Sequence, residues 1–279
     1  MGTDVLHFVY IFFVVNATLF GIVIGSFLNV VIYRIPAGRT IVKGHSMCMS
    51  CDHTLAAKDL VPLFSWLFLK GKCRYCGAPV ASRYAKIESL TGVVFLIGAL
   101  THLDASLIFI VQDSYEIYAA VTFVLFAICA CMVISAMMIW YDTLRGFKIL
   151  AVTPVIASFI VTLMSTLNVN NITPIKVISV NAFVLALVVV SVLLCGLVSL
   201  IFHKPYSRYD CLLDLGIMGT ASIAPYTLFT SIYIQLPVFA VVYALIRALL
   251  RKTSKEKYIG IIGGAGIVIM IVLRYFIVK

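Results

Sequence analysis

Long apolar runs separated by short polar segments dominate the pattern of hydrophobic and polar positions along this 279-residue chain. A helix that crosses a bilayer needs roughly 20 predominantly apolar residues. The runs that approach or exceed this length lie at residues 5–32, 88–111, 117–140, 148–167, 177–202, 212–233, 236–250 and 258–278. The pattern therefore predicts an all-α polytopic membrane protein with about eight transmembrane helices, the seventh of which is short.

The first run, residues 5–32, is expected to be a transmembrane helix and not a signal peptide. It lacks a basic leading region and a small-residue cleavage site. Near its end, Gly25, Ser26 and Asn29 share one helix face. We expect this face to pack against another helix, because an asparagine inside hydrocarbon needs a hydrogen-bond partner.

Composition and charge change this picture little. Hydrophobic residues make up 63% of the chain and charged residues 11%, whereas a soluble domain carries about 25% charged residues. The net charge of +10 does not indicate nucleic-acid binding, because Lys and Arg gather in short loops between apolar runs. A transporter would place charged residues inside the runs, and almost none is seen there.

The basic loops also predict an orientation in the membrane. If the largest polar segment, residues 34–87, is cytoplasmic, alternation places loops 141–147, 203–211 and 247–257 on the same side. These loops are basic as well, as the excess of Lys and Arg in cytoplasmic loops requires. We therefore expect the N-terminus outside and the four segments in the cytoplasm, near anionic lipid headgroups.

Candidate chemistry concentrates in the polar segment. It contains Cys48-x2-Cys51 and Cys73-x2-Cys76, and two such pairs at this separation are typical of a tetrathiolate Zn2+ site. The alternative is four buried or disulfide-bonded cysteines, which a reducing cytoplasm disfavours. We predict a structural, zinc-ribbon-like module at 34–87, following a first helix at 1–33 and preceding a helical domain at 88–279.

Two aspartates are candidates for catalysis. Asp142 follows the third run and Asp210 precedes the sixth, so the predicted topology places both near the cytoplasmic face. Two adjacent carboxylates in a partly desolvated site share a proton, and one then acts as base and the other as acid. The alternative is two separate acidic residues at helix ends. Asp214 lies one turn beyond Asp210.

The N-terminal motifs resemble the type IV prepilin peptidase family of the bacterial inner membrane. The resemblance covers about residues 21–92. It is carried by residues 25–36, 48–51, 59–66, 70–77 and 82–88.

The resemblance implies an aspartic endopeptidase that cleaves the short basic leader of a prepilin or pseudopilin after a glycine, at the cytoplasmic membrane face. It also implies methylation of the new N-terminus with S-adenosylmethionine as donor, although no residue is assigned to that donor. Asp142 matches the first catalytic aspartate of the family and Asp210 the second. Ser207 and Tyr209 replace the two glycines that precede the second aspartate in the family, and no lysine follows Asp210.

We therefore predict a prepilin leader peptidase and N-methyltransferase with Asp142 and Asp210 as its catalytic pair. Asp214 is the alternative second aspartate. The alternative function is a non-catalytic, zinc-bearing membrane scaffold for pilus or secretion-system assembly. The missing glycines favour the scaffold, and the paired aspartates favour the enzyme.

Overall fold

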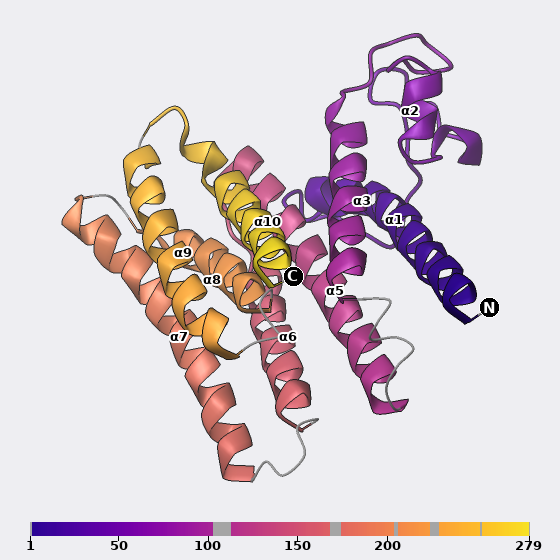
Figure 1. Cartoon of the computed structure of the whole chain (residues 1–279). Helices are drawn as coiled ribbons and strands as arrows, with labels where there is room; N and C mark the ends of the chain where they lie inside the picture. The colour runs from indigo at the N-terminus through magenta and orange to yellow at the C-terminus, as the bar shows by residue number, and fades with distance from the viewer. Residues whose placement is uncertain are drawn as a thin grey trace. The chain divides into compact units, whose positions relative to one another are not determined.

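The computed structural model describes residues 2–102, 113–167, 174–203, 206–223, 229–251 and 253–278. These residues form helices and loops, with two isolated β-bridges and no strand among them. The chain divides into two compact units, Met1–Leu100 and Thr101–Lys279. The predicted all-α class is confirmed for this part of the chain (Figure 1).

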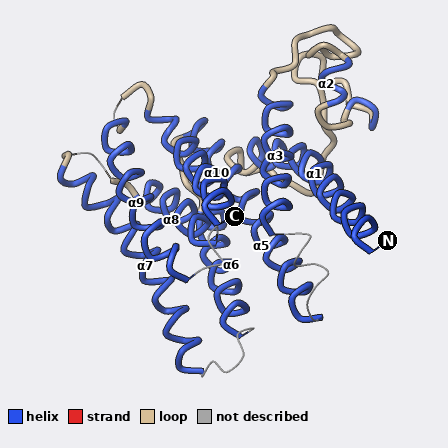
Figure 2. The backbone as a smooth tube through the Cα atoms, in the orientation of Figure 1, coloured by secondary structure: helices blue, strands red, loops and turns tan. Residues whose placement is uncertain are grey.

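The first unit contains two long helices and a loop-rich segment between them. The helices are α1 (Gly2–Arg34) and α3 (Arg83–His102), and the segment between them holds the short helices η1 (Ala57–Asp59) and α2 (Phe64–Phe68). Figure 2 shows that most of this segment is loop. We call residues 34–87 the cysteine module. The three-part division at residues 33 and 87 stays a prediction.

Small residues let α1 and α3 approach closely. A Cβ atom added to Gly25 would lie 2.7 Å from the Cα atom of Glu88, and one added to Gly21 would lie 2.6 Å from the Cβ atom of Phe95. Neither position therefore accepts a larger side chain without movement of the backbone. Asn29 donates a hydrogen bond to the carbonyl oxygen of Tyr84 over 3.3 Å. The expectation that the face of Gly25, Ser26 and Asn29 packs against another helix is confirmed.

The second unit is a helical bundle built around α8. Its helices are α5 (Asp113–Thr143), α6 (Lys148–Leu167), α7 (Pro174–Ile201), α8 (Arg208–Ile223), α9 (Phe229–Leu250) and α10 (Ile259–Val278), with η2 (Glu256–Tyr258) before the last. Helix α8 contacts each of the other five long helices. Its apolar side chains Leu213, Ile217 and Met218 are at most 2% exposed. The side of α8 that faces its neighbours is therefore shielded from solvent.

The long helices overlap the predicted apolar runs, with corrections to the sixth and seventh. The sixth run was expected at residues 212–233, but α8 spans Arg208–Ile223 and residues 229–233 belong to α9. The seventh run was expected to be short, at residues 236–250, but α9 begins earlier, at Phe229. Pro237 lies inside this helix, and helices packed among neighbours tolerate proline because other groups satisfy the freed backbone atoms. The polar and helix-breaking residues near 235–237 therefore do not end the helix.

Within the described residues, three helices are long and apolar enough to cross a membrane. They span His7–Arg34, Ala120–Thr143 and Val184–Ile201, and the segments Lys148–Ile160 and Leu236–Leu250 are apolar but shorter. These helices mark a membrane protein. The count of about eight crossings stays a prediction.

Candidate functional sites

The four module cysteines converge on one point. Their Sγ atoms all lie within 4.8 Å of one another, and the Sγ atoms of Cys48 and Cys76 are 3.9 Å apart. A tetrahedron with Zn–S bonds of about 2.3 Å has S–S edges of about 3.8 Å. The residues present therefore fit Zn2+ or a similar thiophilic ion, held by Cys48, Cys51, Cys73 and Cys76.

Each cysteine pair is held in the same kind of turn. The N–H of Asp52 donates to the carbonyl oxygen of Cys48 over 2.9 Å, and the N–H of Gly77 donates to that of Cys73 over 2.9 Å. Asp52 and Gly77 each follow the second cysteine of a pair and have φ values of 53° and 71°, the region that glycine adopts without strain. The turns are closed by isolated bridges between Met47 and Thr54 and between Lys72 and Pro79. The two turns are thus matched halves of one site.

Asp59 ties η1 to the second turn. Its carboxylate accepts a hydrogen bond from Arg74 Nε over 2.6 Å and another from Tyr75 Oη over 2.8 Å. The Arg74 guanidinium lowers the pKa of Asp59, and the carboxylate raises the pKa of Tyr75. The Tyr75 ring also lies 3.7 Å from the His53 ring, measured between centroids. These contacts join both turns of the cysteine module.

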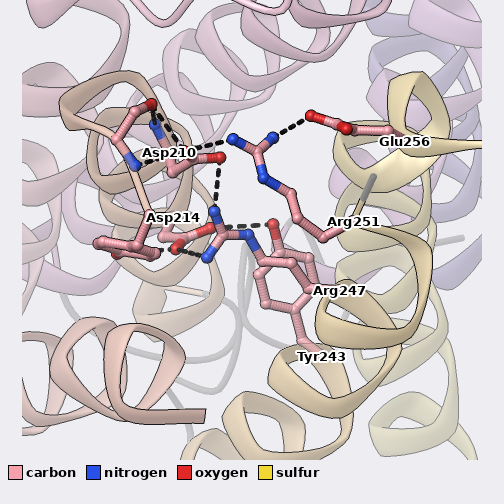
Figure 3. A network of polar contacts seen from close by, with 8 residues as sticks. Asp210, Asp214, Tyr243, Arg247, Arg251 and Glu256 are labelled. Atoms are coloured by element: carbon pink, nitrogen blue, oxygen red, sulfur yellow. Dashed lines mark hydrogen bonds and ion pairs between the residues drawn. The ribbon is translucent and has the colours of Figure 1, made fainter. Parts of the chain in front are cut away.

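A second region of interest is a buried group of charged side chains in the second unit (Figure 3). Asp210 and Asp214 lie one turn apart on α8 and are fully buried. Arg247, near the end of α9, pairs with Asp210 Oδ1 over 2.6 Å and with Asp214 Oδ2 over 2.9 Å. Arg251, one turn later, pairs with Asp210 Oδ2 over 2.9 Å and also with Glu256. We call these five residues the charge cluster.

The cluster has the charge order Asp214, Arg247, Asp210, Arg251, Glu256, so each arginine lies between two carboxylates. Arg247 is 1% exposed. Burial of charges is costly unless they are paired, and the alternating order places each arginine at ion-pair distance from two carboxylates.

Uncharged groups add hydrogen bonds to both aspartates. Asp210 Oδ2 accepts from the backbone N–H and the hydroxyl of Ser207, over 2.7 and 2.6 Å. Asp214 accepts from Tyr206 Oη over 3.0 Å and from Tyr243 Oη over 3.1 Å. Burial raises the pKa of Tyr206, so this phenol stays neutral and remains a donor.

The end of α5 lies beside this cluster. The guanidinium of Arg251 lies 5.8 Å from the ring centroid of Trp140. A Cβ atom added to Gly146 would lie 2.7 Å from the carbonyl oxygen of Tyr209. The loop that follows Asp142 therefore packs directly against the backbone turn that carries Asp210. Both predicted aspartates belong to segments that meet at one end of the bundle.

The two aspartates differ in their surroundings. Asp142 is exposed, whereas Asp210 is 0% exposed and has both oxygens engaged by arginines. Their action as a catalytic pair stays a prediction. Sequence reasoning assigned Arg247 and Arg251 to a basic loop and missed their pairing. The available signal was an arginine at the end of an apolar run, one turn before a second arginine, because ionisable residues at such positions need partners.

Comparison with known proteins finds relatives for the cysteine module but not for the charge cluster. Residues 19–102 match the family profile described as the Bacterial Peptidase A24 N-terminal domain. The "Prepilin leader peptidase/N-methyltransferase" of Myxococcus xanthus is 47% identical over 83 residues, which are 30% of this chain and 25% of that protein. The "Type 4 prepilin-like proteins leader peptide-processing enzyme" of Escherichia coli is 38% identical over 104 residues, covering 31% of this chain and 39% of the relative.

A third relative, the "Prepilin leader peptidase/N-methyltransferase" of Aeromonas hydrophila, is 35% identical over 107 residues, covering 30% of this chain and 37% of its own. No solved structure matches this chain. The matched segment resembles the N-terminal domain of bacterial A24 peptidases, and it lies in a chain with helices long and apolar enough to cross a membrane. Over residues 19–102 the chain is similar to type IV prepilin peptidases, which confirms the predicted resemblance for this segment. The charge cluster lies outside the matched residues, and the matches span 25 to 39% of these relatives' lengths.

Proposed function

We propose that this protein is a prepilin leader peptidase of the bacterial inner membrane. Its substrate would be a type IV prepilin or pseudopilin, cut after the glycine that ends the basic leader. The observation that carries this proposal is the A24 N-terminal domain at residues 19–102, shared with relatives named for leader processing. The preformed cysteine cluster lies within that domain.

Cleavage would use Asp142 and Asp210, with one carboxylate taking a proton from water and the other giving a proton to the scissile amide. The contact of Gly146 with Tyr209 supports the proposal, because it joins the two segments that carry these residues. Arg247, Arg251 and Ser207 would fix the orientation of the Asp210 carboxylate. The exposed Asp142 would be the group that meets the substrate from solvent.

Methylation of the new N-terminus is the second proposed activity, with S-adenosylmethionine as methyl donor. The names of two of the relatives support it. The module cysteines would not take part, because four thiolates around Zn2+ leave no open position for a reactant. Zinc bound by Cys48, Cys51, Cys73 and Cys76 would stabilise the fold of the cysteine module.

The proposed orientation places segments 34–87, 141–147, 203–211 and 247–257 in the cytoplasm. The pairing of Arg251 with Asp210 and Glu256 supports a common side for segments 203–211 and 247–257. The close approach of Gly146 to Tyr209 supports the same side for segment 141–147. Accessibility labelling from each side of the membrane tests it. The proposal requires residues 60 and 142 to be labelled from the same side.

A second candidate function is a non-catalytic scaffold for pilus or secretion-system assembly. The engagement of Asp210 favours it, since Oδ1 meets Arg247 and Oδ2 meets Arg251 and Ser207. A carboxylate bonded in this way has few free acceptor positions for a catalytic water. In a scaffold the cluster would serve only to hold α8 against α9.

Cleavage of a purified prepilin by the full chain in phospholipid vesicles tests the proposal. Mass spectrometry should find a leader ending in glycine and, with S-adenosylmethionine present, a mature chain heavier by one methyl group. Asp210→Asn should abolish cleavage, whereas Asp214→Asn should retain it per folded molecule. Absence of cleavage by the folded, zinc-containing wild type would leave the scaffold as the better account.

A further inference from the structure

The short helix α2 presents an apolar face that has no role in the proposed reaction. Phe64, Leu67 and Phe68 are spaced so that they share one side of the helix, and they are 46%, 52% and 82% exposed. Leu60 and Val61, just before the helix, are 41% and 44% exposed. Large apolar side chains gathered in this way mark an interaction surface.

The opposite side of α2 is fixed to the cysteine module. Trp66 Nε1 donates to the carbonyl oxygen of Val80 over 3.1 Å. The Trp66 ring covers Gly71, where an added Cβ atom would lie 3.0 Å from the ring. Trp66 therefore holds the helix, and the face of Phe64, Leu67 and Phe68 is directed outward as a consequence of the fold.

The start of α2 is held at the depth of the last turns of α1. The N–H of Leu63 donates to Glu88 Oε2 over 2.6 Å, and the Cα atom of Glu88 packs on Gly25 of α1. Helix α1 is long and apolar enough to span a membrane and ends at Arg34. At 1.5 Å per residue, Gly25 lies only about 13 Å before that end. The apolar face is therefore tethered near the boundary between hydrocarbon and headgroups.

The charge around this face matches an anionic surface. The segment 34–87 contains nine Lys and Arg residues and two aspartates, and one of these, Asp59, is already paired with Arg74. Lys58 and Lys70 flank the apolar positions along the chain and are exposed. Apolar side chains bordered by lysines are typical of segments that lie in the plane of a membrane interface.

We propose that the face formed by Leu60, Val61, Phe64, Leu67 and Phe68 docks into the headgroup region of an anionic bilayer. The aromatic rings enter the interface, where such side chains are favoured, and the lysines meet the lipid phosphates. The surface anchors the cysteine module beside the membrane and does not depend on the proposed peptidase activity.

Photocrosslinking of the full chain tests this proposal. The crosslinking amino acid p-benzoyl-phenylalanine is placed at position 68 or, as a control, at Met49, which is 70% exposed on the first cysteine turn. Both proteins are reconstituted in phosphatidylcholine vesicles with and without phosphatidylglycerol, and zinc content verifies the fold. Position 68 should give several-fold more lipid adduct than position 49. Phosphatidylglycerol should increase the yield at position 68, and Lys70→Glu should reduce this increase.

Three results would overturn the proposal. Equal lipid adducts at positions 68 and 49 would show that α2 has no special contact with the bilayer. A yield at position 68 that is the same with and without phosphatidylglycerol would show that the face has no preference for anionic lipid. Adducts that join position 68 to a peptide of this chain or of a second copy would assign the apolar face to protein packing.

Discussion

The cysteine module and the charge cluster both bring together residues that are distant in sequence, but they do so by different physical means. In the module, short hydrogen-bonded turns position each cysteine pair, and residues adjacent in sequence form these turns. In the cluster, Asp210 and Arg247 come from different helices and meet only because α8 is packed against α9. The first kind of site can be predicted from spacing, and the second needs the fold.

The family comparison follows the same division. Residues 19–102 match known relatives and include the cysteine turns, whereas the cluster has no counterpart in that match. The function proposed from the module therefore rests on its similarity to these relatives. Function inferred from the cluster has to be derived from this chain's own geometry.

The largest expected effect is the loss of metal from the module. Cys73→Ser should remove zinc and unfold the module, because structural zinc contributes on the order of 10 kcal/mol to folding. Elemental analysis and limited proteolysis of residues 34–87 measure both. Cys131→Ser, a cysteine on α5 outside the cluster of four, is the matched control and should keep its zinc. Full zinc content in the Cys73 variant would contradict the assignment of the four cysteines as zinc ligands.

A smaller but still large effect is expected in the charge cluster. Arg247→Met should lower the free energy of unfolding by about 3–5 kcal/mol, because it leaves Asp210 and Asp214 buried with incomplete pairing. Denaturant titration in detergent measures this change. Arg208→Met, at an exposed arginine on the same side of the bundle, should change the value by less than about 0.5 kcal/mol. Equal effects of the two substitutions would mean that the cluster does not stabilise the second unit.

The smallest effect concerns pH. Arg74 lowers the pKa of Asp59 in the folded module, so this carboxylate stabilises the fold at pH values above its unfolded pKa of about 4. That contribution should be lost as the pH falls from about 4 through the lower folded pKa. Asp59→Asn removes it while leaving the cysteines in place. The stability of wild type relative to this variant should therefore decline in acid, and a pH-independent difference would contradict the assignment.

The sequence predicts some parts of the structure and not others, for physical reasons that differ from one part to the next. Apolar run lengths predicted the long helices, because a helix that crosses a bilayer needs roughly 20 apolar residues whatever its neighbours are. The face of Gly25 and Asn29 could be predicted since an amide in hydrocarbon requires a partner. The start of α9 was misplaced because packing allows Pro237 inside a helix. The pairing of Arg247 with two aspartates could not be predicted, because the helix neighbours of α8 are set by tertiary packing.

The most direct test of the proposed function is leader cleavage by Asp142→Asn. Asp142 is exposed at the end of α5, so its substitution should leave folding, zinc content and the charge cluster unchanged. A prepilin peptidase that uses Asp142 and Asp210 as its acid–base pair should lose cleavage to background in this variant. Cleavage by Asp142→Asn at the rate of the wild type would contradict the proposed pair.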